Sequence, residues 1–204
     1  MIKVHGGIFS RAGMVMFALE ELGQPYEMVD MAPRSAPTRS EEYLALNPNG
    51  KLPTLQDGDL TLWETQAILF YLAQKYGDNK LWADSLEQVA EIYRWSLYVS
   101  NQLEVPALDM LIQAKYSDGK PDAAVLDKAG GEFRRFLPTL EARLEGRKYV
   151  ACDHLTVADI HGALVLAWGK LAGFDFSDYP NVNSWIKRML NHPAQQKLMA
   201  RARG

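Results

Sequence analysis

The sequence predicts an α+β protein of two domains, in which a small domain with a four-stranded mixed sheet precedes an all-helical domain. Two observations support this prediction. Strand-like and amphipathic helical stretches alternate over residues 1–77, in the order βαβαββα. From residue 85 on, the strand patterns disappear and helical spacing continues to the end of the sequence. We therefore expect domains at residues 1–77 and 85–204, joined by a linker at residues 78–84.

The first domain opens with a βαβ unit. Residues 2–5 have the pattern of a short strand, residues 14–22 that of an amphipathic helix, and residues 26–29 that of a second strand. Such a unit pairs its two strands in parallel. Residues 31–38 contain two prolines and predict a surface loop. A brief helix is expected at residues 40–46, where early carboxylates favour a helix start.

A turn and a hairpin follow the brief helix. Residues 47–50 combine Asn, Pro and Gly, which is typical of a turn. Short strands are expected at residues 52–55 and 60–63, joined by the Asp-Gly-Asp turn at residues 57–59. Pro53 has no N–H to give to a strand ladder, so it lies at an edge or a bend, where a cis peptide bond is possible.

The next helix begins at Glu64 and Thr65. Its N-terminus offers a hydroxyl and free N–H groups, which suit a carboxylate. The backbone edge at Leu52–Pro53 offers hydrogen-bond partners to an extended peptide. Together these two features predict a site for a small anionic peptide.

The second domain has only helical patterns. A capping box at Ser85 begins a long helix that runs to about Ala114, with Pro106 as a candidate kink. Thr156 and Asp159 form a second capping box, before a strongly apolar helix. Further helices are expected at residues 122–144, from Pro180 and from Pro193.

The composition excludes several classes of function. A formal net charge of -3 gives no basic field for nucleic acid or an anionic membrane surface. No run approaches the roughly 20 apolar residues of a membrane span. The single cysteine, Cys152, forbids an internal disulfide and is typical of a reducing compartment. We therefore expect a cytoplasmic protein without nucleic-acid or membrane partners.

Ser10 lies in the loop between the first strand and the first helix, where α/β folds place ligands. If a thiol ligand lies along Leu52–Pro53, the Ser10 hydroxyl could donate a hydrogen bond to the sulfur and favour its thiolate form. Alternatively, Ser10 only caps the helix that follows, as serines before helices usually do. Both interpretations stay open on the residues alone.

The chain carries a series of short motifs at Ser10–Ala12, Leu19–Gly23, Tyr26, Asn47–Leu55, Glu64–Ile68, Tyr71–Leu72 and Thr156–Ile160. In their order and spacing these motifs resemble the cytosolic glutathione transferase superfamily over nearly the full length of the chain. The form of the Ser10 loop is similar to a bacterial or fungal serine-type subgroup.

The resemblance implies a thioredoxin-like N-terminal domain, an all-α C-terminal helical bundle and a homodimer. It implies that glutathione is the co-substrate, with Pro53 as a cis-proline and the Leu52 backbone paired with the cysteinyl part. Glu64 would approach the amine of the γ-glutamyl end, and Thr65 its carboxylate.

For the remaining roles the resemblance leaves alternatives. Lys51 could bind the glycyl carboxylate, or be a solvated loop lysine, and Arg39 is the weaker candidate for that role. Ser10 would be the catalytic residue that stabilises the thiolate, and Arg11 could do the same.

A second-substrate pocket between the domains is expected. Four residues on the long helix are its candidates, with core packing as the alternative for each: Trp95, Tyr98, Val99 and Gln102.

Metal chemistry is not expected, because the histidines show no metal-ligand spacing. Cys152 is expected to behave as a small hydrophobe near the core. The function implied by the resemblance is conjugation of glutathione to small hydrophobic electrophiles, as in detoxification. The alternatives are a glutathione-dependent isomerase, etherase or dehalogenase, or a binding or regulatory protein without catalysis.

Overall fold

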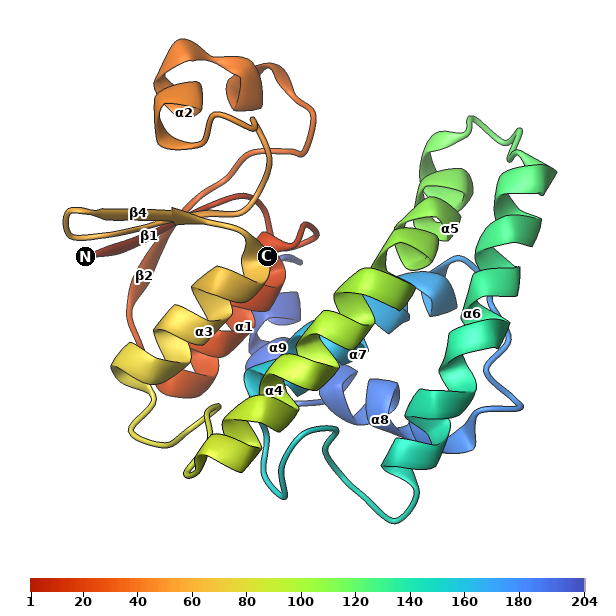
Figure 1. The fold of residues 1–204 in the computed structure, drawn as a ribbon. Helices are drawn as coiled ribbons and strands as arrows, with labels where there is room; N and C mark the ends of the chain where they lie inside the picture. Colours follow the sequence, from red (N-terminus) through yellow and green to blue (C-terminus); the bar gives the residue numbers. More distant parts are fainter. Residues whose placement is uncertain (204) are drawn as a thin grey trace. The chain divides into compact units, whose positions relative to one another are not determined.

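The computed structural model describes residues 1–203, and Figure 1 shows its elements along the chain. The contacts divide the chain into two compact units. The first contains Met1–Trp82 together with the chain from His192 on, and the second contains Ala83–Asn191. The first unit holds the sheet, and the second is helical.

Within residues 1–203 the strands form one four-stranded mixed sheet in the order β2-β1-β3-β4. β1 runs parallel to β2, and β3 is antiparallel to both β1 and β4. The predicted sheet is therefore confirmed. The strands are β1 (Ile2–His5), β2 (Tyr26–Val29), β3 (Thr54–Asp57) and β4 (Leu60–Trp63).

Helices cover this sheet. α1 and α3 lie together on one face, and α2 lies on the opposite side (Figure 1). α1 is buried along most of its length and ends at Gly23, whose φ of 66° is a left-handed conformation that glycine adopts without strain. The helices of the first unit are α1 (Ala12–Leu22), the 3₁₀ turn η1 (Ala36–Arg39), α2 (Glu41–Leu46), α3 (Thr65–Tyr76) and α9 (Pro193–Arg201).

The last helix, α9, packs on α1 in the first unit. The ring of His192 lies 5.1 Å from the ring of Phe17. The carboxylate of Glu20 forms ion pairs with Lys197 and Arg201 of α9. The compact helical unit therefore ends at Asn191, whereas the sequence pattern extended it to residue 204. Helical spacing identifies α9 as a helix but carries no information about which unit it packs against.

The helical unit contains five α-helices and one π-helical turn within its described residues 83–191. In the described part of the chain, no helix is long and apolar enough to cross a membrane. The elements are α4 (Leu86–Tyr98), η2 (Val99–Leu103), α5 (Glu104–Tyr116), α6 (Ala123–Leu144), α7 (Val157–Leu171) and α8 (Pro180–Leu190).

The π-helical turn η2 interrupts the long helix that the sequence predicts. Pro106 has no N–H, so the carbonyl of Gln102, four residues earlier, loses its helical partner. A wider turn over Val99–Leu103 accommodates this loss, and the N–H of Glu104 reaches back five residues to the carbonyl of Val99. The disturbance of the helix expected from Pro106 is therefore a π turn just before the proline.

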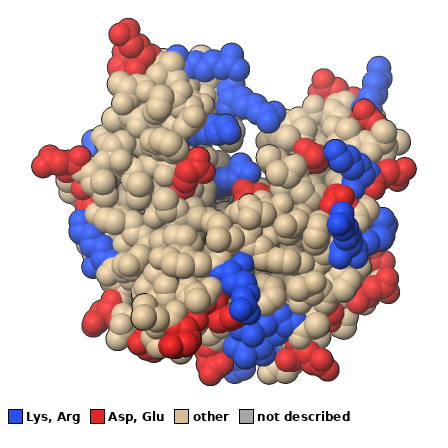
Figure 2. Space-filling model, viewed as in Figure 1, with Lys and Arg blue, Asp and Glu red and all other residues tan. Residues whose placement is uncertain are grey.

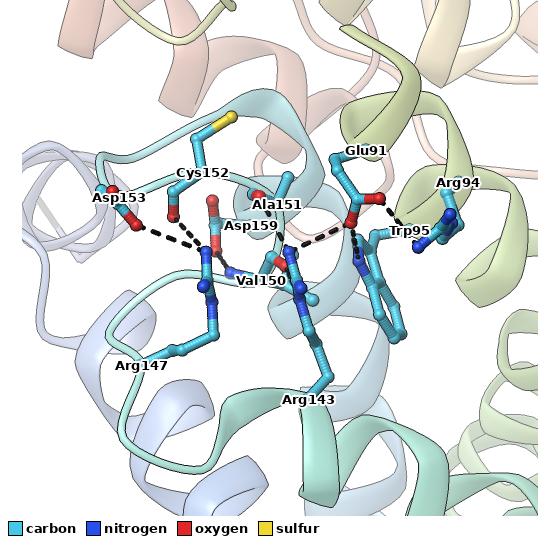
Figure 3. Close-up of polar contacts among 10 residues, drawn as sticks. All are labelled: Glu91, Arg94, Trp95, Arg143, Arg147, Val150, Ala151, Cys152, Asp153 and Asp159. Atoms are coloured by element: carbon cyan, nitrogen blue, oxygen red, sulfur yellow. Dashed lines mark hydrogen bonds and ion pairs between the residues drawn. The ribbon is translucent and has the colours of Figure 1, made fainter. Parts of the chain in front are cut away.

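Asp159, at the start of α7, organises the loop before that helix. Its buried carboxylate accepts hydrogen bonds from Thr156 N at 3.0 Å and Val150 N at 2.7 Å, the second drawn in Figure 3. The predicted capping box with Thr156 is therefore confirmed. Burial raises the pKa of Asp159, and the hydrogen bonds to its carboxylate oppose that effect.

Candidate functional site

One row of paired residues crosses strands β1, β3 and β4 at the end of the sheet where the predicted site segments lie. His5 lies opposite Thr54 in the β1–β3 ladder, and Thr54 lies opposite Trp63 in the β3–β4 ladder. Each predicted site segment is attached to this row. The loop with the predicted catalytic serine follows His5, Pro53 precedes Thr54, and Glu64 follows Trp63. Strand register therefore brings three segments that are far apart in sequence to one end of the sheet.

The peptide bond between Leu52 and Pro53 is cis, as the resemblance implies. Pro53 is buried immediately before β3, while Leu52 is half-buried and Lys51 is exposed. Because Pro53 has no N–H, the ladder begins at Thr54. The backbone of Leu52 lies just outside the ladder, where an extended peptide can pair with it.

The serine loop (residues 6–11) lies beside Leu52. A β-carbon built on Gly6 would lie 3.1 Å from Ser10 Oγ and 3.5 Å from Leu52 Cβ. It would also lie only 2.7 Å from Ala12 Cβ, and Gly6 has a φ of 126°. Glycine is therefore required here both for its conformation and for its small size. The close approach places the Ser10 hydroxyl on the same side of Gly6 as the Leu52 side chain.

The Ser10 hydroxyl has two local hydrogen bonds. It donates to the carbonyl of Gly7 at 2.8 Å and accepts from the N–H of Ala12 at 3.1 Å. The second bond is that of a helix cap, so this contact of the capping interpretation is present. It does not exclude the other role, because Ser10 is only half-buried and its hydroxyl hydrogen can turn from Gly7 toward a ligand.

The start of α3 carries the other predicted contacts. Glu64 has φ 74° and ψ 118°, a region that residues with a side chain rarely adopt. Its side chain is exposed, whereas Thr65 is buried at the first helical position. The backbone N–H groups of this first turn have no partners within their own helix and are suited to an anion.

Positive charge gathers near the site. Figure 2 shows Lys and Arg side chains along one edge of the segment that carries α2 in Figure 1. The basic residues of that segment are Arg34, Arg39 and Lys51, and all three are exposed. Arg11 is half-buried on the serine loop. These basic side chains are candidates for binding the carboxylates of a ligand.

The four residues predicted for a second-substrate pocket lie on α4 and η2. Trp95 is buried, its indole N–H donates to Glu91 at 3.1 Å, and the guanidinium of Arg143 lies 5.4 Å from its ring (Figure 3). Tyr98 donates its hydroxyl hydrogen to the carbonyl of Phe136 at 2.8 Å.

The other two differ in exposure, because Val99 is fully buried and Gln102 is half-buried. Trp95, Tyr98 and Val99 therefore pack within the helical unit. A role for any of the four residues in binding a second substrate stays a prediction.

Phe9 is a candidate that the sequence analysis missed. Its side chain is 81% exposed on the serine loop, directly before Ser10. Neither helical nor strand spacing gives this residue a place in the core, and that signal could have identified it.

Cys152 is buried, and burial raises the pKa of its thiol to about 11. It is therefore a neutral, unreactive thiol at physiological pH. The backbone carbonyl of Cys152 accepts a hydrogen bond from Arg147 (Figure 3). Across residues 1–203, no group of three or more His, Cys, Asp or Glu side chains is placed to hold a metal ion.

Comparison with known families and proteins gives a consistent result. Residues 2–74 match the family model for the glutathione S-transferase N-terminal domain, and residues 93–193 match that for the C-terminal domain. Glutathione S-transferase 1 of Zea mays is 34% identical over 205 residues, which cover 98% of this chain and 96% of that protein. Glutathione S-transferase GstB of Escherichia coli K12 is 31% identical, with 91% and 90% covered.

The fold agrees with these matches. The crystal structure of glutathione transferase F7 from Populus trichocarpa superposes with a TM-score of 0.90 at 25% identity, with 98% of each chain covered. The subgroup expected from the serine loop stays a prediction, because the relatives named here come from both plants and bacteria. The first unit has a thioredoxin-like fold, the second is all-α, and the chain belongs to the glutathione transferase family.

Proposed function

We propose that this transferase binds glutathione along Leu52–Pro53 and transfers its thiolate to small hydrophobic electrophiles. The observation that supports this proposal is the convergence of the serine loop, the cis-proline and the start of α3 on one row of the sheet. A structure of glutathione S-transferase-I bound with lactoylglutathione, 33% identical with a TM-score of 0.87, adds support from a relative.

Each part of glutathione has a partner of matching chemistry. The Leu52 backbone pairs with the cysteinyl part, which leaves the thiol beside the serine loop. Thr65 binds the γ-glutamyl carboxylate with its hydroxyl and its backbone N–H at the helix start. Glu64 takes the amine, and Lys51 takes the glycyl carboxylate.

The Ser10 hydroxyl stabilises the thiolate. To donate to sulfur it gives up its bond to Gly7, which costs about 0.5–1.5 kcal/mol. A charge-assisted bond to the thiolate is about twice as strong as the neutral bond that it replaces. The N–H of Ala12 continues to donate to Ser10 Oγ, and this polarises the hydroxyl into a better donor. Arg11 is the alternative stabilising group.

The electrophile binds beside the thiol. Phe9 offers an exposed aromatic surface on the same loop as Ser10. We propose that it forms part of the electrophile's binding surface, with the four residues of α4 and η2 as further candidates. Most of the rate enhancement then comes from holding the thiolate and the electrophile in a reactive orientation.

The proposed assembly is a homodimer in the cytoplasm. An exposed apolar stripe follows α4 at intervals of seven and four residues, which are nearly whole helical turns, and continues past the π turn η2 to the start of α5. Its members are Leu86, Tyr93, Leu97 and Val105. Light scattering should give the mass of a dimer, and Leu97→Glu should shift it toward the monomer.

The function is tested by calorimetry with glutathione and by the ultraviolet absorbance of the bound thiolate. Wild type and Ser10→Ala are compared, with Ser85→Ala as the matched control because Ser85 caps α4 in the helical unit. We expect thiolate at neutral pH in wild type and in Ser85→Ala, and its loss in Ser10→Ala with glutathione still bound.

The other outcomes are also decisive. Thiolate that persists in Ser10→Ala assigns its stabilisation to Arg11 or a backbone amide. Absence of glutathione binding in wild type overturns the transferase proposal and favours a regulatory protein. A panel of electrophiles, isomerisable substrates, ethers and halides then separates conjugation from the related thiolate reactions.

A further inference from the structure

Three buried polar side chains surround the backbone next to the cis-proline. We call this group the loop clamp; it consists of Tyr43 in α2, Asn47 just after α2, and Thr54 at the start of β3. Their exposed fractions are 3%, 2% and 0%. None of them was among the residues singled out for ligand binding.

The loop clamp is centred on the carbonyl oxygen of Lys51. The Tyr43 hydroxyl donates to this oxygen at 2.6 Å, and the Asn47 amide donates to it at 2.9 Å. The Thr54 hydroxyl lies 2.8 Å from the Tyr43 hydroxyl and accepts from the Asn47 amide at 3.1 Å.

The donors and acceptors of the loop clamp match completely. Tyr43 gives its hydrogen to Lys51 and accepts that of Thr54, while Asn47 uses both amide hydrogens. The Asn47 side-chain oxygen accepts from the N–H of Asn49 at 3.0 Å. Burial raises the pKa of Tyr43, which therefore stays a protonated donor at neutral pH. Such a fully satisfied buried network fixes the groups that it joins.

The clamped atoms lie on both sides of the Leu52–Pro53 bond. The Lys51 carbonyl belongs to the peptide unit that contains the N–H of Leu52, so its two hydrogen bonds set the direction of that N–H. Thr54 fixes the chain on the far side of Pro53. A β-carbon on Gly50, which has φ 59°, would lie 2.8 Å from the Thr38 carbonyl, so the start of the loop is also tightly packed.

We propose that Tyr43, Asn47 and Thr54 are positioning residues that hold the Leu52 backbone in the orientation that pairs with the cysteinyl part of glutathione. This inference rests on the proposed function. The loop clamp touches neither the thiol nor the electrophile. It acts by keeping the pairing edge preorganised, so that glutathione does not lose binding free energy in ordering the loop.

The test uses Tyr43→Phe and Thr54→Val, with Thr54→Ser as the conservative variant that restores the hydroxyl. The matched control is Tyr71→Phe. The Tyr71 hydroxyl donates to Asp57 at 2.7 Å, at the opposite end of β3 from Thr54. Tyr71→Phe thus removes the same group from the same unit without touching the loop.

Two measurements are made on each full-length variant. The first is the dissociation constant for glutathione, together with kcat at saturating glutathione. Tyr43→Phe and Thr54→Val should raise the dissociation constant about five- to tenfold and change kcat less than twofold, whereas Thr54→Ser and Tyr71→Phe stay near wild type. The second is hydrogen exchange of the ligand-free protein. The Gly50 amide, which donates to the Asn47 carbonyl at 2.9 Å, should exchange faster only in Tyr43→Phe and Thr54→Val.

The outcomes separate this inference from the proposed function. If wild type does not bind glutathione, the proposed function fails and the positioning role fails with it, while faster Gly50 exchange in the two variants would still show that the loop clamp orders the loop. If wild type binds glutathione and Tyr43→Phe binds as well as Tyr71→Phe does, the positioning role is overturned. Equal exchange at Gly50 in wild type and both variants also overturns it.

Discussion

The indole N–H of Trp185 donates to the carboxylate of Asp159 at 2.9 Å inside the helical unit. The same oxygen of Asp159 accepts from the N–H of Val150. Its other oxygen accepts hydrogen bonds from the N–H and the hydroxyl of Thr156. One buried side chain thus joins α7, α8 and the loop before α7.

Replacement of this carboxylate should destabilise the protein strongly. In Asp159→Asn an amide NH₂ group must face N–H donors, so at least one of them is left buried without an acceptor. We expect the free energy of unfolding to fall by about 2–4 kcal/mol, measured by urea denaturation. Asp175→Asn is the control, because Asp175 is exposed and accepts hydrogen bonds from Ser177 in its own loop, and it should cost less than about 1 kcal/mol. Equal losses in both variants would contradict the assigned role of Asp159.

The Asp57 cluster predicts a pH dependence of stability. Burial tends to raise the pKa of Asp57, but hydrogen bonds from Lys75, Tyr76 and Tyr71 prevail and hold it at about 2. Because this pKa is depressed on folding, the contribution is complete above about pH 4 and is lost as the pH falls toward 2. The free energies of unfolding of wild type and Asp57→Asn should therefore approach each other by roughly 1 kcal/mol between pH 4 and pH 2. The change is small because Lys75 is partly exposed, so solvent screens its ion pair with Asp57.

The control for this prediction is Asp59→Asn, which removes an exposed carboxylate from the same hairpin. Its curve should stay parallel to that of wild type between pH 4 and pH 2. A wild-type curve parallel to that of Asp57→Asn would show that the cluster contributes nothing.

Substitutions at Gly6 and Gly58 distinguish the cost of backbone strain from the cost of a steric clash. Both have a positive φ, but a β-carbon on Gly58 meets no atom within 4 Å, whereas one on Gly6 lies 2.7 Å from Ala12 Cβ. Gly58→Ala should cost about 1 kcal/mol of unfolding free energy, and Gly6→Ala clearly more. Gly6→Ala should also weaken glutathione binding, as calorimetry would show, because it displaces the serine loop. Unchanged affinity in Gly6→Ala would argue against a site at this loop.

Glu64 predicts a trade-off between stability and binding. Its φ of 74° and ψ of 118° carry strain that glycine would relieve. We expect Glu64→Gly to raise the free energy of unfolding by about 1 kcal/mol, because the relief exceeds the entropy cost of glycine. Its affinity for glutathione should fall. Asp118→Gly, at a φ of 51° far along the chain, should leave affinity unchanged. A stabilised Glu64→Gly that retains full affinity would remove Glu64 from the proposed site.

Much of the fold could be predicted from the sequence because local signals and the global fold agree. The βαβ spacing, the turn at residues 47–50 and the capping box at Thr156 each indicate an element that the structure contains. The π turn at η2 was not predicted, because Pro106 indicates a disturbed helix but not how the backbone absorbs it. The partner of α9 is likewise set by tertiary packing.

For the candidate site, sequence identified segments better than it identified contacts. Pro53 stands out by its own backbone chemistry, whereas the role of Glu64 was implied by the family resemblance, and the structure gives both unusual conformations. The loop clamp was missed because Tyr43 appears as one apolar position of a short helix, and its hydroxyl contacts depend on a chain reversal eight to eleven residues away.

The return of α9 to the first unit has a consequence for biosynthesis. Every residue of the helical unit is translated between α3 and α9, so the surface of α1 that α9 covers stays open until α9 leaves the ribosome. The helical unit can therefore complete its folding while the first unit still lacks α9. A fragment that stops at Trp82 should therefore be less stable than the same unit in the full chain.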